Sequence, residues 1–469
     1  MTTNLGAERI ERDFLGAIAV PAEALFGPQT ARAMANFRIS GIPLSHYPSL
    51  LRSLAAIKRA AAQANVELGD LDPEIGQAIE RACGEVIVGQ HFEHFPIDVF
   101  QGGAGTSTNM NMNEVLANRA IQILGHPLGR YDVVHPNDHV NRSQSTNDVY
   151  PTALRMAIRA DSDALKGALV ALAAAFDQKG IEFANIVKLG RTQLQDAVPM
   201  TLGQELGAFA TTIREDLLRL DESTRLLSEV NLGGTAIGTG IAADPRFRRV
   251  ILEKLLGQGE ALIPAENLIE ASWDTGALVT FSGTLKRIAV KLSKIANDLR
   301  LLSSGPRGGL GEIHLPAMQA GSSIMPGKVN PVIPEVVNQV AFQVIGQDMT
   351  VTMAAEAGQL QLNAMEPVIG FNLLWSLKLL CNAVTALTEL CVKGIRADEA
   401  MCKRHLDEST ALATALIPAI GYDAAAQLAK ESIRTGRSVR DIYADGGGRE
   451  DLLDALADSL AHSRGGRLR

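Results

Sequence analysis

Cysteine is scarce in this sequence of 469 residues, and its spacing excludes two roles. The four cysteines, Cys83, Cys381, Cys391 and Cys402, form no CxxC pair, so neither a disulfide framework nor a cysteine zinc site is expected. The nine histidines contain no HExxH spacing, which disfavours a metal-dependent hydrolase. The sequence therefore predicts buried, reduced thiols and no metal ligands.

Long apolar runs and a surplus of basic charge are also missing. No segment reaches eighteen uninterrupted apolar residues, and the first residues, MTTNLGAERIERDFLG, contain no apolar run of signal-peptide length. Neither a membrane span nor a secretory signal is expected. The formal net charge of −8 and the pI near 5.7 give no support to nucleic-acid binding. The sequence predicts a cytoplasmic protein with neither a nucleic-acid nor a membrane partner.

The sequence does contain apolar periodicity at helical spacing. Seven residues from Leu278 to Leu299 recur at alternating intervals of three and four, the pattern of an apolar seam along one long helix. Similar seams run from Leu373 to Cys391 and from Leu206 to Leu227, and further long helices are predicted over 151–179 and 331–355, with Pro331 at the first helical position. Because strand-type alternation is nearly absent, these five helices predict an all-α bundle.

The chain is long enough for two or three domains. Residues 1–144 mix short helical runs with Gly- and Asn-rich loops, 145–395 contain the long helices, and 396–469 form a small helical tail. A helix that is apolar around much of its circumference must be covered by something. We therefore expect the bundle to form a subunit interface, while an intrachain core remains the alternative for each seam.

Four stretches combine hydroxyl or amide side chains with glycine at or near the start of a predicted helix. They are GGAGTSTNMNMNE at 102–114, HPNDHVNRSQSTND at 135–148, GRTQLQDAVPMTLGQE at 190–205 and AGSSIMPGKVNPVIPE at 320–335. Helix starts favour anions, but such residues are more commonly caps and turn residues. Three consecutive donors at 145–147 exceed what one cap requires, which favours a small, oxygen-rich substrate.

Two nucleotide-binding patterns can be rejected. Gly321 and Gly327 are separated by five residues where a P-loop has four, and Val329 stands where Ser or Thr would hold magnesium. GTGIAA at 238–243 matches a dinucleotide fingerprint, but no predicted strand precedes it. Neither stretch predicts a nucleotide cofactor.

GSSIMPGKVNP, residues 321–331, resembles the signature GSSxMPxKxNP of the fumarase/aspartase superfamily. GGAGTSTNMNMNEV, NDHVNRSQSTND, GRTQLQDAVPMTLGQE and AEAGQLQLNAMEPV look like further blocks of that family in the expected order. The resemblance covers nearly the whole chain. It implies an all-α, three-domain fold whose central five-helix bundle assembles into a homotetramer with a twenty-helix core, active sites shared among three subunits, and no organic cofactor. It does not bear on activation by divalent cations.

The resemblance also implies an elimination reaction that yields fumarate from a dicarboxylate. Ala104, Thr146 and Gln193 match the ammonia-lyase branch, where class II fumarases usually have Ser, Ser and His. The expected activity is that of a carbon–nitrogen lyase acting on L-aspartate, and a class II fumarase acting on L-malate is the alternative. An argininosuccinate-type substrate is less expected because that branch usually has Gln at Gly327. A non-catalytic protein on a lyase scaffold is disfavoured because the polar loops are intact.

Roles for single residues follow from the family positions. Ser322 is expected to be the general base and Lys328 to stabilise the charge that builds up on the β-carboxylate. Backbone N–H groups of the Gly-rich turn would stabilise the serine oxyanion. Because Gln193 cannot be charged, no His–Glu relay with Glu335 is expected, and residues 304–329 are predicted to form a lid. The residues expected to bind substrate are Thr106, Ser145, Thr146, Asn147, Thr192, Gln193, Ser323 and Asn330.

Overall fold

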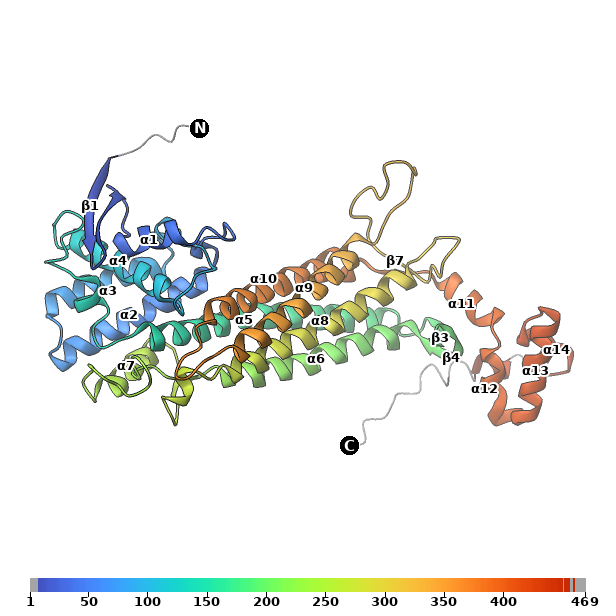
Figure 1. Cartoon of the computed structure of the whole chain (residues 1–469). Coiled ribbons are helices and arrows are strands. Elements are labelled where there is room, and N and C mark those ends of the chain that lie inside the picture. Colours follow the sequence, from blue (N-terminus) through green and yellow to red (C-terminus); the bar gives the residue numbers. More distant parts are fainter. Residues whose placement is uncertain (1–6, 450, 456–458, 460–469) are drawn as a thin grey trace. The chain divides into compact units, whose positions relative to one another are not determined.

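The computed structural model describes residues 7–449, 451–455 and 459, and most of them are helical (Figure 1). The α-helices are α1 (Pro28–Asn36), α2 (Pro48–Leu68), α3 (Pro73–Ile87), α4 (Thr106–Ile123), α5 (Thr146–Glu182), α6 (Leu202–Leu226), α7 (Phe247–Gly257), α8 (Gly276–Leu302), α9 (Val332–Glu356), α10 (Glu366–Leu390), α11 (Glu399–Glu408), α12 (Ala411–Ile420), α13 (Tyr422–Thr435) and α14 (Val439–Asp445). The short helical turns are η1 (Leu44–His46), η2 (Phe92–His94), η3 (Pro136–Val140), η4 (Glu270–Ser272) and η5 (Val392–Gly394). The strands are β1 (Glu8–Asp13), β2 (Gly16–Pro21), β3 (Val187–Thr192), β4 (Gln195–Thr201), β5 (Glu229–Val230), β6 (Ile263–Pro264), β7 (Ile313–His314) and β8 (Arg396–Ala397).

The long helices α5, α6, α8, α9 and α10 confirm the five predicted from periodicity. In α8 every seam residue from Leu278 to Leu299 exposes at most 2% of its surface, as expected for a seam that faces a core. One detail of the prediction is wrong. Pro331 lies immediately before α9, which begins at Val332, so the proline precedes the helix instead of occupying its first position.

The chain folds as two compact units. Unit 1 comprises Met1–Leu165, Arg219–Lys286 and Gln343–Leu379, and unit 2 comprises Lys166–Leu218, Arg287–Phe342 and Leu380–Arg469. Each of the five long helices therefore contributes part of its length to each unit. The three-domain division at residues 144 and 395 stays a prediction.

Local sequence explains how helices are joined in unit 1. Helix α2 ends at Leu68 and is followed by Gly69, whose φ of +83° is the left-handed conformation of a helix C-cap. Asp72 then caps α3 by accepting hydrogen bonds from the backbone N–H groups of Glu74 and Ile75, and Pro73 fills the first helical position. This short connection lets α2 pack along α3 (Figure 1).

Strands contribute little to the described residues and pair as four two-stranded sheets. The pairs β1–β2, β3–β4 and β7–β8 are antiparallel, and β5–β6 is parallel. The β3–β4 ladder has an irregularity between Leu189 and Arg191. The all-α class is therefore correct, but the sequence did not predict this hairpin, whose tip contains two of the expected site residues.

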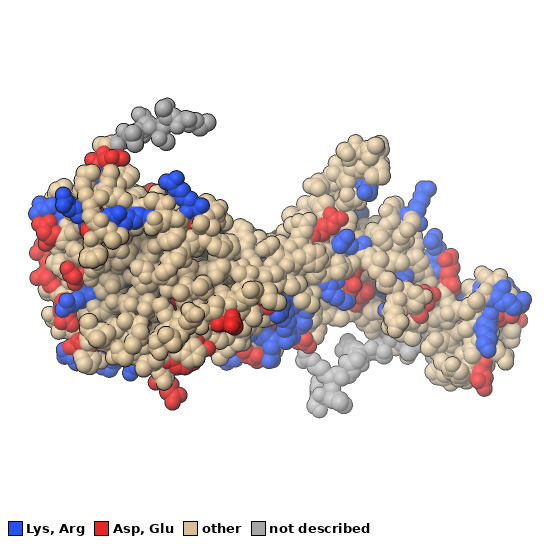
Figure 2. Space-filling model, viewed as in Figure 1, with Lys and Arg blue, Asp and Glu red and all other residues tan. Residues whose placement is uncertain are grey.

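Helix α9 has an exposed apolar stripe. Phe342 and Met349 are each 63% exposed and Met353 is 66% exposed, with Ile345 between them. These residues are spaced by three or four positions, so they lie on one side of the helix. Figure 2 shows few charged side chains over α9 and α10 on the visible face. Exposed apolar stripes of this kind are typical of surfaces that bind another protein.

Helix α10 and the cysteines can be compared with two expectations, the lack of a membrane span and the burial of the thiols. Within the described residues, one segment, Glu366–Gly394, is long and apolar enough to cross a membrane, but more than half of its most apolar window is buried inside the protein. That burial is typical of a core helix. Cys83, Cys391 and Cys402 are buried thiols and Cys381 is half-buried.

Candidate active site

The residues expected in the site fall into two sets, one in each unit. Thr106 and residues 145–147 belong to unit 1. Thr192, Gln193 and four residues of the loop before α9 belong to unit 2. Within unit 1 the starts of α4 and α5 are joined directly, because Asn109 Nδ2 donates a hydrogen bond of 3.2 Å to Thr146 Oγ1.

Thr106 follows a left-handed turn. Gly103, Ala104 and Gly105 have φ values of +91°, +55° and +88°, and the Thr106 N–H donates to Gly103 O over 2.9 Å. A Cβ on Gly105 would lie 2.5 Å from the Tyr150 ring, so only glycine fits there. The turn leaves Thr106 exposed at the first residue of α4, although its own N–H and that of Thr108 already donate hydrogen bonds within the protein.

Ser145 caps α5, which agrees with the alternative given above that these residues are helix caps and turn residues. Its N–H donates to Asp148 Oδ1 over 3.0 Å, and its Oγ accepts from the Asn147 N–H over 3.2 Å, which is a reciprocal arrangement of the capping-box kind. The Asn147 side chain donates to Ala236 O over 2.8 Å. Residues 145–147 therefore already serve the fold, and substrate contacts would be additional.

A buried carboxylate, Asp148, lies in the first turn of α5, and no local sequence pattern predicts its role. Asp148 Oδ2 accepts from the N–H groups of Gly233 and Thr235 over 3.0 and 2.9 Å. Burial raises the pKa of Asp148 to about 6, although these N–H groups oppose the shift. Lys58 donates to Asn141 Oδ1 over 2.8 Å, and burial lowers its pKa to about 7. These groups position the 145–147 segment.

Thr192 and Gln193 lie at the tip of the β3–β4 hairpin, ten and nine residues before α6, and thus not at a helix start. The two turn residues, Gln193 and Leu194, have φ values of +54° and +60°. Two-residue hairpin loops favour this conformation but usually place Asn or Gly there. Non-glycine residues in left-handed backbone are concentrated at functional sites. The side chains of Thr192 and Gln193 are exposed to solvent.

A buried ion network fixes the base of this hairpin. The carboxylate of Glu312, which is completely buried, accepts from Lys188 over 2.9 Å, from Arg191 over 2.7 Å and from His405 over 2.9 Å. Burial would raise the pKa of Glu312, but these partners outweigh it and hold the pKa below its ordinary value. Because Glu312 directly precedes β7, the network anchors the hairpin and the start of the long loop that leads to α9.

The loop before α9 closes on itself and stands out from the helices around it (Figure 1). The Gly321 N–H donates to Lys328 O over 2.9 Å, and Asn330 Nδ2 donates to Gly321 O over 2.7 Å. A Cβ on Gly321 would lie 2.6 Å from Lys328 O, so the closure requires glycine. The loop therefore has a defined shape between its two ends.

Within this loop, the Ser322 hydroxyl oxygen accepts two backbone hydrogen bonds. The N–H groups of Ile324 and Met325 donate to it over 3.2 and 2.8 Å. Donors aimed at an oxygen stabilise negative charge on it, so this geometry favours the ionised form of the hydroxyl. Ser323 and Lys328 in the same loop are exposed to solvent.

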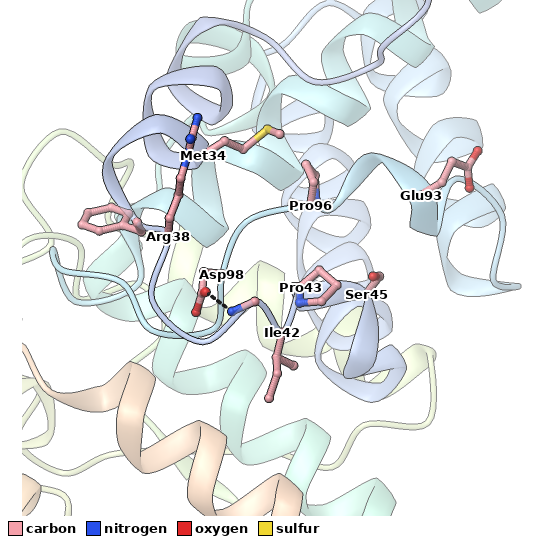
Figure 3. A pocket seen from close by; sticks show the side chains of 10 residues that line it. Met34, Arg38, Ile42, Pro43, Ser45, Glu93, Pro96 and Asp98 are labelled. Carbon is pink, nitrogen blue, oxygen red and sulfur yellow. Dashed lines mark hydrogen bonds between the residues drawn. The ribbon is translucent and has the colours of Figure 1, made fainter. Parts of the chain in front are cut away.

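A pocket of about 470 Å³ lies elsewhere in unit 1 (Figure 3). Residues of α1, η1 and the segment after α3 line it, and the Gly41 N–H donates to Asp98 Oδ2 over 2.8 Å. None of its ten lining residues belongs to either set described above.

Two family models match the chain. The model described as Lyase matches residues 16–346, and the one described as Fumarase C C-terminus matches residues 412–460. The aspartate ammonia-lyase of Pseudomonas fluorescens is 57% identical, covering 96% of this chain and 94% of the relative. The Escherichia coli aspartate ammonia-lyase is 52% identical, covering 94% of this chain and 92% of the relative.

Solved structures agree with these matches. A fumarate lyase:delta crystallin from Brucella melitensis, bound to cobalt, superposes with a TM-score of 0.95 at 56% identity, covering 97% of this chain and 100% of that chain. A class II fumarase from Schistosoma mansoni superposes with a TM-score of 0.91 at 36% identity. The match covers 97% of this chain and 99% of the fumarase chain. The chain therefore belongs to the fumarase/aspartase superfamily of lyases.

Proposed function

We propose that this lyase reversibly eliminates ammonia from L-aspartate to give fumarate. The observation that carries the proposal is the match to aspartate ammonia-lyases at 52–57% identity over at least 92% of the chain. The class II fumarase is only 36% identical. Ala104 and Thr146 agree with the ammonia-lyase branch, and Gln193 at the exposed hairpin tip provides an amide where a fumarase would have histidine.

Ser322 removes the β-proton in the proposed reaction. Negative charge then builds up on the β-carboxylate, which passes through an aci-carboxylate intermediate before the C–N bond breaks and ammonia leaves. The two N–H groups that donate to Ser322 Oγ support its role as a base because they favour the oxyanion over the alcohol. Lys328 supplies positive charge to the same loop and stabilises both the oxyanion and the developing dianion.

The remaining polar residues hold the two ends of the substrate. Thr192, Gln193 and Asn330 bind the β-carboxylate together with Lys328 in this proposal, and Ser323 is a further substrate contact. The amino group and the α-carboxylate are bound by Thr106, Ser145, Thr146 and Asn147. Asn330 uses one N–H to close the loop on Gly321 O and keeps a second N–H for substrate. The elimination transfers no electrons to an acceptor, so we expect it to need no organic cofactor.

The proposed assembly is a homotetramer with a twenty-helix core and active sites shared among three subunits. The exposed apolar stripe of α9 supports an interface along the bundle. The division of the expected site residues between the two units is compatible with sites assembled from several copies. We also expect the protein to act in the cytoplasm, where L-aspartate and fumarate are soluble metabolites.

The deciding experiment offers purified full-length protein L-aspartate and L-malate in separate assays and follows the near-ultraviolet absorbance of fumarate. We expect fumarate to form from L-aspartate and little from L-malate. Turnover of L-malate alone would establish a fumarase, and no turnover of either would point to a non-catalytic relative. The same assay with ammonia and fumarate, read as loss of absorbance, tests reversibility.

A further inference from the structure

Three side chains with metal-binding atoms converge on the turn η2, outside the proposed active site. Within the described residues, His91, Glu93 and His94 are the group of this kind whose ligand atoms all lie within 4.8 Å of one another. His94 Nε2 is 3.5 Å from Glu93 Oε1. The imidazole rings of His91 and His94 are stacked, with centroids 6.3 Å apart.

We propose that His91, Glu93 and His94 bind a first-row transition-metal ion. Two imidazoles and a carboxylate suit Zn²⁺, Co²⁺ or Ni²⁺, whereas Mg²⁺ and Ca²⁺ prefer oxygen ligands throughout. Metal–ligand distances of about 2.0–2.2 Å place the ligand atoms of a tetrahedral site roughly 3.3 Å apart. The Glu93–His94 pair is already close to this separation. Rotation of the His91 side chain would bring its ring nitrogen to the same distance from the other two ligand atoms.

The surroundings of His91 resemble those of a metal ligand. Its Nε2 is 2.9 Å from Glu85 Oε2, and Arg119 holds that carboxylate with two hydrogen bonds of 2.6 and 2.9 Å. A carboxylate that accepts from one ring nitrogen leaves the lone pair of the other for a metal, an arrangement common around metal-binding histidines. His91 has a φ of +67°, a left-handed conformation that histidine adopts more often than most non-glycine residues do.

The site is accessible and tied to the fold. The Glu93 side chain is 70% exposed and lines the pocket of Figure 3, on the side away from Arg38 and Asp98, so water can complete the coordination. His94 O accepts a hydrogen bond of 2.9 Å from Asn111 Nδ2, in α4. A metal would therefore stiffen η2 and its attachment to α4. The sequence contains neither CxxC nor HExxH spacing and so predicts no metal ligands, while these three residues share one turn.

A Co²⁺ titration of the full-length chain, followed by visible absorbance and by calorimetry, tests the site. We expect one Co²⁺ per chain with the absorbance bands of a nitrogen-ligated ion. The variants Glu93→Gln and His94→Ala should lose this binding, and Glu85→Gln should weaken it by roughly ten- to a hundredfold because it removes the partner of His91. His91→Asn is the preferred change at that position, because Asn tolerates left-handed backbone.

The matched control is His126→Ala, which removes an exposed histidine at the end of α4 and should leave Co²⁺ binding unchanged. Thermal unfolding without metal establishes that each variant is folded, and Glu93→Gln is the least disruptive change because its side chain is the most exposed. Co²⁺ binding that persists undiminished in both Glu93→Gln and His94→Ala would overturn the proposal. The site contains no residue of the proposed reaction, so this outcome would leave the ammonia-lyase assignment untouched.

Discussion

Several residues expected to bind substrate also hold the fold together. Ser145 caps α5, Asn330 closes the loop before α9, and Ser322 Oγ accepts two backbone hydrogen bonds. The same hydroxyl or amide geometry serves a turn and an anion, so sequence alone could not separate the two roles. A substitution at such a residue therefore needs a control in which a turn is weakened without loss of the proposed chemistry.

Ser322→Ala should lower kcat for L-aspartate by about 10²- to 10⁴-fold, the usual contribution of a general base. The KM should change little, because the serine acts on the C–H bond. Ser304→Ala is the matched control: the Ser304 hydroxyl also accepts a backbone N–H, from Leu310 over 3.0 Å, in the preceding part of the loop. Steady-state kinetics of both variants measure these effects. Equal losses of kcat in the two variants would mean that Ser322 acts only as a turn residue.

Glu312→Gln should destabilise the protein by about 3–5 kcal/mol at neutral pH, since it leaves Arg191 without its buried carboxylate partner and Lys188 with Glu205 alone. The pKa of Glu312 is lowered in the folded state, so its stabilising effect is present above the ordinary carboxyl pKa and is lost as the pH falls through the folded value. The difference between wild type and variant should therefore shrink below about pH 4.

Denaturant unfolding at a series of pH values measures this difference. Glu222→Gln is the control, because Glu222 forms a half-exposed pair with Arg219 of 2.7 Å and such surface pairs contribute little. A Glu312→Gln penalty that stayed constant down to pH 3 would contradict the ionised state assigned to Glu312.

At the scale of elements, the sequence predicted the long helices but not the hairpin. Seams such as Leu278–Leu299 are repeated often enough to identify a helix from local pattern. Strands β3 and β4 have six and seven residues, contain Gly190 and Pro199, and show no clear alternation. They are fixed by distant partners, Glu312 and the packing of α11 and α12, which local patterns do not reveal.

In the candidate site too, features with a local sequence pattern were predicted and features that depend on distant partners were not. The loops ahead of α4, α5 and α9 were predicted because Gly-rich polar stretches ahead of helices are a local signal. Asp148, Lys58 and Glu312 were missed because a buried charge is recognised only by its partners, which come from far along the chain. His91, Glu93 and His94 were missed because the left-handed backbone at His91 and the single helical turn that follows it bring them together.

Leu194→Gly should stabilise the β3–β4 hairpin. Left-handed backbone costs a non-glycine residue roughly 1–2 kcal/mol, and glycine loses about 0.5–1 kcal/mol of that gain through its greater unfolded-state entropy. A net gain of up to about 1.5 kcal/mol is expected, and the Leu194 side chain, which is 71% exposed, has little packing to lose. Leu218→Gly, at an exposed position inside α6, should destabilise instead. Thermal unfolding midpoints that shift in the same direction would refute the backbone argument.

At the scale of the whole molecule, an apolar stripe on α9 is exposed in a single chain. Met349→Glu would place a carboxylate in the proposed subunit interface, where burial of an unpaired charge is unfavourable. Size-exclusion chromatography with light scattering should show a smaller assembly, and activity should fall with it. Ile433→Glu, on exposed α13, should change neither. An active tetramer of the Met349→Glu variant would place the interface elsewhere.

The proposed sharing of the active site between chains predicts that two inactive variants can restore each other. Thr106→Val alters the unit 1 set and Ser322→Ala the unit 2 set, so neither variant alone should form a complete site. If the two sets at one site come from different subunits, dissociating and reassembling a mixture will create some sites with both sets intact, and fumarate production will return. Ser322→Ala mixed with Lys328→Met is the control, because both changes lie in one loop and every mixed site keeps one of them. Recovery in the first mixture alone would establish shared sites, whereas no recovery in either would mean that each chain builds its own.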